Sequence, residues 1–162
     1  SMIYTVRAFM PGMLEKNFGH IINISSASSL TGAPKLAVYA ATKWAVAGLT
    51  ESLRLEVKKM GKHGVKFSSV HPNFLKKGLF EGTKLNFLGQ LLAPGVKSHD
   101  QVAKVIVNRA IKLGFHSPKV PWIMNQMVLF RALLPSSLLI KLSSFYGLYN
   151  MMDDYKGYKD GR

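Results

Sequence analysis

Residues 23–43 read NISSASSLTGAPKLAVYAATK, and this stretch decides how the chain folds. An apolar run over residues 21–24 ends in serines, glycine and proline then signal a turn, and a helical pattern opens just before Tyr39. On a helix, residues four apart share one face, so Tyr39 and Lys43 should point into the same space. We expect that space to lie beside the strand end that carries Ser26.

The phenol, ammonium and hydroxyl groups of these residues suit proton transfer at an oxygen atom. A phenol ordinarily keeps its proton at neutral pH, so it accepts one only where a fixed cation stabilises the phenolate. We expect Lys43 to supply that cation, Tyr39 to act as acid or base, and Ser26 to hydrogen-bond the substrate oxygen. Each residue alone also has a structural explanation, as a packing tyrosine, a solvated lysine or a turn-forming serine. Their joint order and spacing favour the catalytic interpretation.

The segment YAATK at residues 39–43 resembles the YxxxK signature of the short-chain dehydrogenase/reductase family. Ser26 stands thirteen residues before the tyrosine, as the catalytic serine of that family does. The resemblance implies an oxidoreductase that uses NAD or NADP, with Tyr39 as general acid and base and Ser26 polarising the substrate oxygen. It also implies that Lys43 assists the phenol and binds the nicotinamide ribose.

The order of strand, helix and strand predicts an α/β fold in which residues 20–25 and 65–70 pair in parallel. The resemblance implies the C-terminal portion of a Rossmann-type doubly wound parallel sheet. Family members open with a nucleotide-binding half that carries a TGxxxGxG turn, whereas the glycines here are too dispersed to form one. We therefore expect that half to be missing and the isolated chain to be inactive. We expect residues 1–121 to form a partial catalytic domain and residues 122–162 an apolar helical extension.

Further elements follow from periodicity and capping signals. Pro11 should interrupt the first helix. Residues 79–97 read as an irregular loop, where the resembling family places a loop that covers the substrate. The predicted elements are helices over residues 3–16 and 37–60, a helix started by the capping box of Ser98 and Gln101, and a short strand near residues 119–121.

The segment HPNFLKKG at residues 71–78 stands where the resembling family usually reads PGxxxT and holds the nicotinamide carboxamide. Asn73 replaces the glycine and tolerates the left-handed conformation, so we expect the turn to be retained. Lys77 replaces the threonine, and a cation there should weaken binding of the oxidised nicotinamide unless it reaches a cofactor phosphate. The resemblance implies cofactor contacts, mostly through the backbone, from Pro72, Asn73, Leu75 and Lys77.

The composition narrows the range of ligands and partners. There is no cysteine, and the five histidines lack HxxxH or HExxH spacing, so we expect no metal. The net charge of +14 suggests polyanionic partners, but the basic residues are spread along the chain without a nucleic-acid motif, so we expect no nucleic acid. The sequence shows no secretory leader and no apolar run of about 18 residues. We expect a cytoplasmic or an intracellular membrane-associated location.

The C-terminal part is rich in apolar residues. Residues 122–134 are apolar on most sides, and a second apolar helix begins at Pro135. These helices are too short to span a bilayer but suit its surface, with Trp122, Tyr146 and Tyr149 at the interface and lysines near the headgroups. The layout of this part resembles the family branch of epidermal-type retinol dehydrogenases and membrane-associated 17-beta-hydroxysteroid dehydrogenases. It implies a small apolar alcohol or carbonyl substrate.

Two hypotheses describe the function of the chain, an oligomeric enzyme and a non-catalytic module. In the resembling family, the helix over residues 37–60 packs against a second subunit, which implies a homodimer or homotetramer. The alternative is a non-catalytic dimerisation or binding module, a truncated product that keeps the helices but lacks the cofactor half. An upstream TGxxxGxG segment would favour the enzyme, and a translation start at Met2 would favour the module. Small residues that allow close helix approach are Ala40, Ala41, Ala45 and Ala47.

Overall fold

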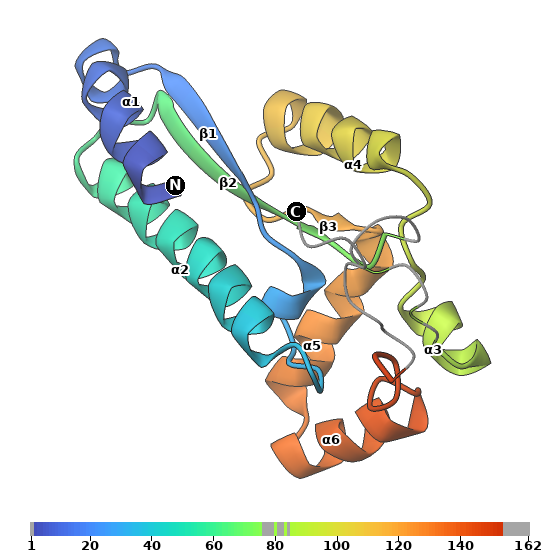
Figure 1. The fold of residues 1–162 in the computed structure, drawn as a ribbon. Helices are drawn as coiled ribbons and strands as arrows, with labels where there is room; N and C mark the ends of the chain where they lie inside the picture. Colours follow the sequence, from blue (N-terminus) through green and yellow to red (C-terminus); the bar gives the residue numbers. More distant parts are fainter. Residues whose placement is uncertain (1, 76–79, 81–82, 84, 154–162) are drawn as a thin grey trace, which may run out of the picture.

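Strands and helices alternate along the chain as an α/β fold (Figure 1). The computed structural model describes residues 2–75, 80, 83 and 85–153. In chain order the elements are α1 (Met2–Lys16), β1 (Gly19–Ile24), η1 (Ala27–Ser29), α2 (Ala37–Lys59), β2 (Val65–Pro72), α3 (Phe87–Leu92), α4 (His99–Val105), η2 (Ile106–Lys112), β3 (Lys119–Val120), η3 (Trp122–Met124), α5 (Asn125–Leu133) and α6 (Ser136–Phe145).

The described strands form a parallel sheet in the order β1-β2-β3. Gly19 stands opposite Val65 where β1 pairs with β2, and His71 stands opposite Lys119 where β3 joins the far side of β2. The predicted parallel pairing is confirmed. Because the strands run in one direction, their carboxyl ends meet at one edge of the sheet, which is where ligands bind in open α/β folds.

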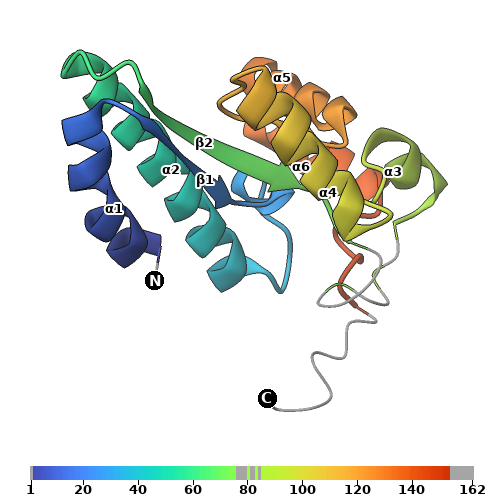
Figure 2. The same ribbon diagram turned by 90° about the horizontal axis from the view of Figure 1, so that it is seen from above.

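Helices cover both faces of the sheet, with α1 and α2 on one side and α4 on the other (Figure 2). Alternate strand residues point to opposite faces. Ile21 and Phe67 therefore pack in the core beneath α1 and α2, whereas Ile22 and Val70 pack against α4. The apolar side chains of both strands are thus divided between the two faces of the sheet.

Two predictions about local structure are wrong. The helix α1 continues through Pro11, which removes the backbone hydrogen bond to Arg7 without ending the helix. Residues 79–97 are not wholly irregular, because α3 lies within them. Asn86 caps that helix, and its side-chain Oδ1 accepts the Gly89 N–H at 2.8 Å.

The helix start at Ser98 is confirmed. Ser98 Oγ accepts the Gln101 N–H at 3.4 Å. The reciprocal half of the predicted capping box differs, since Gln101 Oε1 accepts the N–H of Lys97 at 3.2 Å. The side chain of Gln101 thus reaches one residue further back than predicted.

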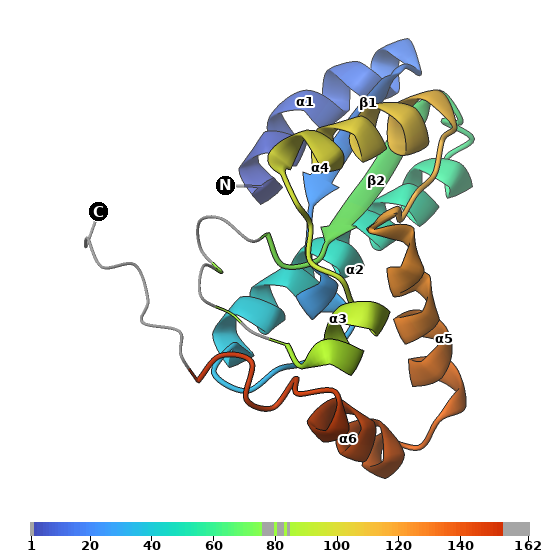
Figure 3. The ribbon, with the colours of Figure 1, turned by 90° about the vertical axis from the view of Figure 1, so that its right-hand side faces the viewer.

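The C-terminal segment gathers beyond the carboxyl ends of the strands, where α3, α5 and α6 lie together (Figures 1 and 3). No helix in the described part of the chain combines the length and apolar character that crossing a bilayer requires. Side chains tie this segment to earlier parts of the fold. The ties run from Arg131 Nη1 to Leu30 O (2.7 Å), from Asn86 Nδ2 to Phe145 O (2.8 Å) and from Lys35 Nζ to Asp153 Oδ1 (2.8 Å).

Candidate active site

Ser26 lies at the carboxyl end of β1, where the chain leaves the sheet and turns into η1. Its extended backbone (φ −164°, ψ 162°) makes it the N-cap of that turn, and its Oγ accepts the Ser28 N–H at 3.2 Å. A hydroxyl has one hydrogen and two acceptor positions. Accepting from Ser28 therefore leaves the Ser26 hydrogen free to donate to another oxygen.

Tyr39 and Lys43 lie one turn apart near the start of α2, on the same face, as predicted. Lys43 Nζ is 5.6 Å from the centroid of the Tyr39 ring and donates to the carbonyl of Ile24 at 3.1 Å. That carbonyl belongs to the last residue of β1, two residues before Ser26. Lys43 thus connects the tyrosine to the strand end that carries the serine.

Ser25, which sequence reasoning missed, also joins the end of β1 to α2. Ser25 is buried, and its Oγ donates to the backbone carbonyl of Lys43 at 2.9 Å. The contact ties the end of β1 to α2 beside the ammonium group. Its sequence signal was weak, because Ser25 stands in a run of serines in which only Ser26 has the expected spacing to Tyr39.

The environment of the site is partly apolar. The half-buried ring of Tyr39 meets Phe80 edge to face, with centroids 5.5 Å apart. Burial lowers the pKa of Lys43. Water screens a half-buried ammonium less than one at an open surface, so its charge acts more strongly on neighbouring groups.

The loop after β2 departs from the predicted conformation. Asn73 is not among the described residues with positive φ, so the expectation of a glycine-like left-handed turn is wrong. Its side chain instead donates from Nδ2 to the carbonyls of Ala93 and Pro94 at 2.9 and 3.0 Å. These two bonds hold the loop beside the segment that follows α3. The Oδ1 of Asn73 is buried without a partner among the described residues.

The other residues predicted to contact the cofactor lie on either side of Asn73. Pro72 closes β2, and Leu75 forms an isolated parallel bridge with Val96. Lys77 lies outside the described residues. The structure therefore places Lys43 beside Tyr39 and joins it to the end of β1, two residues before Ser26. It places Pro72, Asn73 and Leu75 at and beyond the end of the neighbouring strand.

His71 is a buried polar residue that sequence reasoning passed over. Its Nδ1 lies 2.8 Å from Ser29 Oγ, and its Nε2 lies 2.9 Å from Ser69 Oγ and 3.0 Å from Ser117 Oγ. Burial, assisted by the positive charge of Lys119, lowers the pKa of His71 to about 4. The signal was the alternation of Ser69 and His71, which places both side chains on one face of β2.

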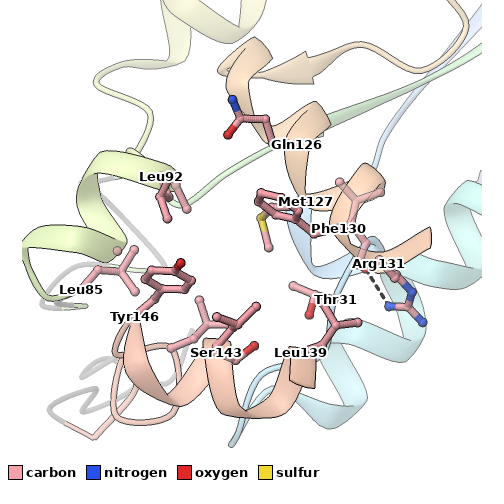
Figure 4. Close-up of a pocket in the computed structure, with 15 residues that line it drawn as sticks. Thr31, Leu85, Leu92, Gln126, Met127, Phe130, Arg131, Leu139, Ser143 and Tyr146 are labelled. Atoms are coloured by element: carbon pink, nitrogen blue, oxygen red, sulfur yellow. Dashed lines mark hydrogen bonds between the residues drawn. The ribbon is translucent and has the colours of Figure 1, made fainter. Parts of the chain in front are cut away.

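An apolar cavity of about 280 Å³ lies between α3, α5 and α6 (Figure 4). Side chains of the three helices face one another across it, among them Leu92, Met127 and Leu139. Ser26, Tyr39 and Lys43 do not line it. It is nevertheless adjacent to the tyrosine, because Leu85 and Leu148 border the cavity and also pack in the apolar cluster that Tyr39 joins.

The chain is similar in sequence to known proteins. Residues 1–85 match the family model described as short chain dehydrogenase. The chain is 30% identical over 161 residues to epidermal retinol dehydrogenase 2 of Mus musculus, covering 97% of this chain and 50% of the relative. It is 36% identical over 91 residues to estradiol 17-beta-dehydrogenase 11 of Mus musculus, covering 56% of this chain and 30% of the relative.

A solved structure shows the same fold. The short chain dehydrogenase from Burkholderia cenocepacia, crystallised in complex with NADP, superposes with a TM-score of 0.67 at 23% identity, covering 87% of this chain and 54% of that chain. The chain spans about half the length of the curated relatives cited above or less. Since the family model matches more than half of these residues, the chain belongs to the short-chain dehydrogenase family.

Proposed function

We propose that this chain carries the catalytic residues of an NAD(P)-dependent oxidoreductase that interconverts an alcohol and its carbonyl compound. The observation that carries the proposal is the position of Lys43, which lies beside the Tyr39 ring and donates to the last carbonyl of β1, next to the serine turn. This arrangement gathers a proton carrier, a cation and a hydroxyl donor at the carboxyl edge of a parallel sheet. Membership of the short-chain dehydrogenase family supports the same reaction class.

In the direction of alcohol oxidation, the Tyr39 phenolate accepts the hydroxyl proton of the substrate, and Lys43 stabilises the phenolate before the transfer. Ser26 donates its hydrogen to the substrate oxygen and holds that oxygen near the phenol. In the reverse direction, Tyr39 returns the proton to the oxygen. The nicotinamide, when bound, takes or supplies the hydride at the carbon.

The residues around the site fit a nicotinamide cofactor. Asn73 Oδ1 is a buried acceptor without a partner among the described residues, and a carboxamide carries the N–H donors that such an acceptor needs. Tyr39 and Lys43 would hold the ribose, and Pro72, Asn73, Leu75 and Lys77 would border the nicotinamide. The family relationship does not favour NAD over NADP.

The apolar cavity supports an apolar substrate, of the kind that the names retinol dehydrogenase and estradiol dehydrogenase describe. A smaller cavity of about 20 Å³ shares Thr31 and Met127 with it and touches Ala27 and Ser28, immediately after Ser26. The shared lining residues put the smaller cavity between the larger one and residues 27–28. We propose that the hydrocarbon part of the substrate occupies the larger cavity and that its oxygen faces Ser26 and Tyr39.

Assembly and location belong to the same proposal. The outer side chains of α1 and α2 include exposed apolar groups such as Phe9, Val38 and Leu55, which supports a homo-oligomer formed through these helices. Exposed Leu133 and Phe145 on the C-terminal helices, with the net charge of +14, support association with an anionic membrane surface. In this proposal residues 1–121 form the catalytic portion and residues 122–162 form the helical extension.

Replacement of the phenol tests the reaction. In a protein that contains this segment together with a nucleotide-binding half, Tyr39→Phe should lower kcat by roughly 10²- to 10⁴-fold for oxidation of a retinoid or steroid alcohol, because it removes the proton carrier. Phenylalanine keeps the edge contact with Phe80, so circular dichroism and thermal unfolding should stay close to those of the parent. Turnover close to that of the parent would exclude the proposed role of Tyr39.

The alternative function is a non-catalytic dimerisation or binding module. The exposed apolar side chains of α1 and α2 favour it. Light scattering combined with cofactor titration separates the two functions. A stable dimer that binds neither NADH nor NADPH, even when the nucleotide-binding half is supplied, would support the module.

A further inference from the structure

A chain of hydrogen bonds runs from the edge of the sheet to the backbone of Ser26, and His71 stands in its middle. On one side, Lys119 Nζ donates to Ser117 Oγ at 3.0 Å, and Ser117 Oγ lies 3.0 Å from His71 Nε2. On the other side, His71 Nδ1 lies 2.8 Å from Ser29 Oγ, which donates to the carbonyl of Ser26 at 2.6 Å. The imidazole is 2% exposed, so water cannot replace these contacts at low cost.

The direction of each hydrogen bond follows from the number of hydrogens available. The Ser29 hydroxyl has one hydrogen and gives it to the Ser26 carbonyl, so toward His71 it can only accept. His71 must therefore carry its hydrogen on Nδ1. Because burial lowers the pKa of His71 to about 4, the ring carries only this one hydrogen at neutral pH, and its unprotonated Nε2 faces the hydroxyls of Ser69 and Ser117, either of which can donate to it.

We propose that neutral His71, protonated on Nδ1, is a positioning residue for Ser26. This inference rests on the proposed function, because it gives a purpose to holding the serine still. His71 orients the Ser29 hydroxyl, Ser29 fixes the Ser26 carbonyl, and the resulting turn places the Ser28 N–H against Ser26 Oγ at 3.2 Å. The hydroxyl hydrogen of Ser26 is thereby aimed away from the turn, toward the substrate.

Nuclear magnetic resonance on the ¹⁵N-labelled chain tests the hydrogen-bond chain without any need for activity. Long-range ¹H–¹⁵N spectra should show a protonated Nδ1 and an unprotonated Nε2 for His71 at neutral pH. Ser29→Ala, which removes the link to Ser26, should shift the Ser28 amide resonance. Ser69→Ala is the matched control, because Ser69 is a buried serine on the opposite side of the imidazole, and it should leave that resonance in place.

The side chain of His71 is then varied in the same spectra. His71→Leu should shift the Ser28 resonance, whereas His71→Asn should restore most of the parent position, since the asparagine amide can donate from near the place of Nδ1. If His71→Leu does not fold, Ser29→Ala alone decides the question. Protonation of His71 on Nε2, or an unchanged Ser28 resonance in Ser29→Ala, would overturn the proposal.

Kinetics distinguish a positioning role from a merely structural one. In the catalytically complete protein, Ser29→Ala should lower kcat by roughly ten- to a hundredfold with little change in KM, because a misplaced donor weakens the transition state more than substrate binding. Ser69→Ala should change neither constant. Equal kcat values for parent and Ser29→Ala would overturn the positioning role. Absence of turnover in the parent would instead refute the proposed function, and the resonance data would still decide whether His71 orders the Ser26 turn.

Discussion

Acidification should destabilise this protein through His71. The pKa of His71 is about 4 in the folded protein, against an ordinary value of 6.5. The unfolded chain therefore binds a proton at this histidine more tightly than the folded protein does. The contribution is fully present above pH 6.5 and is lost as the pH falls from 6.5 toward 4. At about 1.4 kcal/mol for each tenfold difference in proton affinity, the interval corresponds to a loss of about 3 kcal/mol in the free energy of unfolding.

Urea unfolding followed by circular dichroism measures this effect between about pH 4 and pH 7.5. The comparison protein is His71→Asn, which has no titrating group at this position but keeps an amide donor toward Ser29. His20 and His116, whose pKa values burial also lowers, titrate in both proteins and cancel in the difference. The parent should lose about 3 kcal/mol more than His71→Asn over this range. Parallel pH profiles would refute the reasoning that His71 is held neutral in the fold.

Three further substitutions test the core and the ties of the C-terminal segment, each by urea unfolding at neutral pH. Phe67→Ala should cost about 3–5 kcal/mol, because this fully buried ring fills the core between β2 and α2. Arg131→Gln should cost about 1–2 kcal/mol, since it removes the contact with the Trp44 ring at 4.4 Å and the hydrogen bond to Leu30. The control is Lys141→Gln, which changes the same charge on the exposed surface of α6. Lys35→Ala should cost less than about 1 kcal/mol, because its ion pair with Asp153 is more than half exposed on both sides. A larger loss in Lys35→Ala than in Arg131→Gln would contradict this order.

The parts of the site that depend on local geometry were predictable from the sequence. Helical periodicity alone places Tyr39 and Lys43 on one face, and an apolar run that ends in serine places Ser26 at a strand end. The parallel pairing of β1 and β2 follows from the helix between them. These features need no knowledge of distant contacts, and the structure confirms their placement.

The parts that depend on distant partners were not predictable. His71 finds Ser29 and Ser117 at separations of 42 and 46 residues, which only the sheet register and the loop after α4 and η2 bring together. The conformation of Asn73 was predicted from its own backbone preference, but two carbonyls 20 and 21 residues later determine it. The proposed effect of Lys77 on the nicotinamide stays a prediction, because this residue lies outside the described part of the chain.

Two contacts hold the loop between η1 and α2 to residues far along the chain, and this separation has a consequence for synthesis on the ribosome. The carbonyl of Leu30 bonds with Arg131, which is synthesised 101 residues later. The side chain of Lys35 bonds with Asp153, which is synthesised 118 residues later. At translation rates of about 5–20 residues per second, roughly 5 to 25 s separate the emergence of the loop from that of its partners. During that interval β1 and α2 can already pair with their neighbours, while the turn after Ser26 lacks its outer support. The nascent chain can therefore form β1, β2 and β3 before residues 30 and 35 gain these two contacts, and a product that ends before α5 would keep the strands without the contacts.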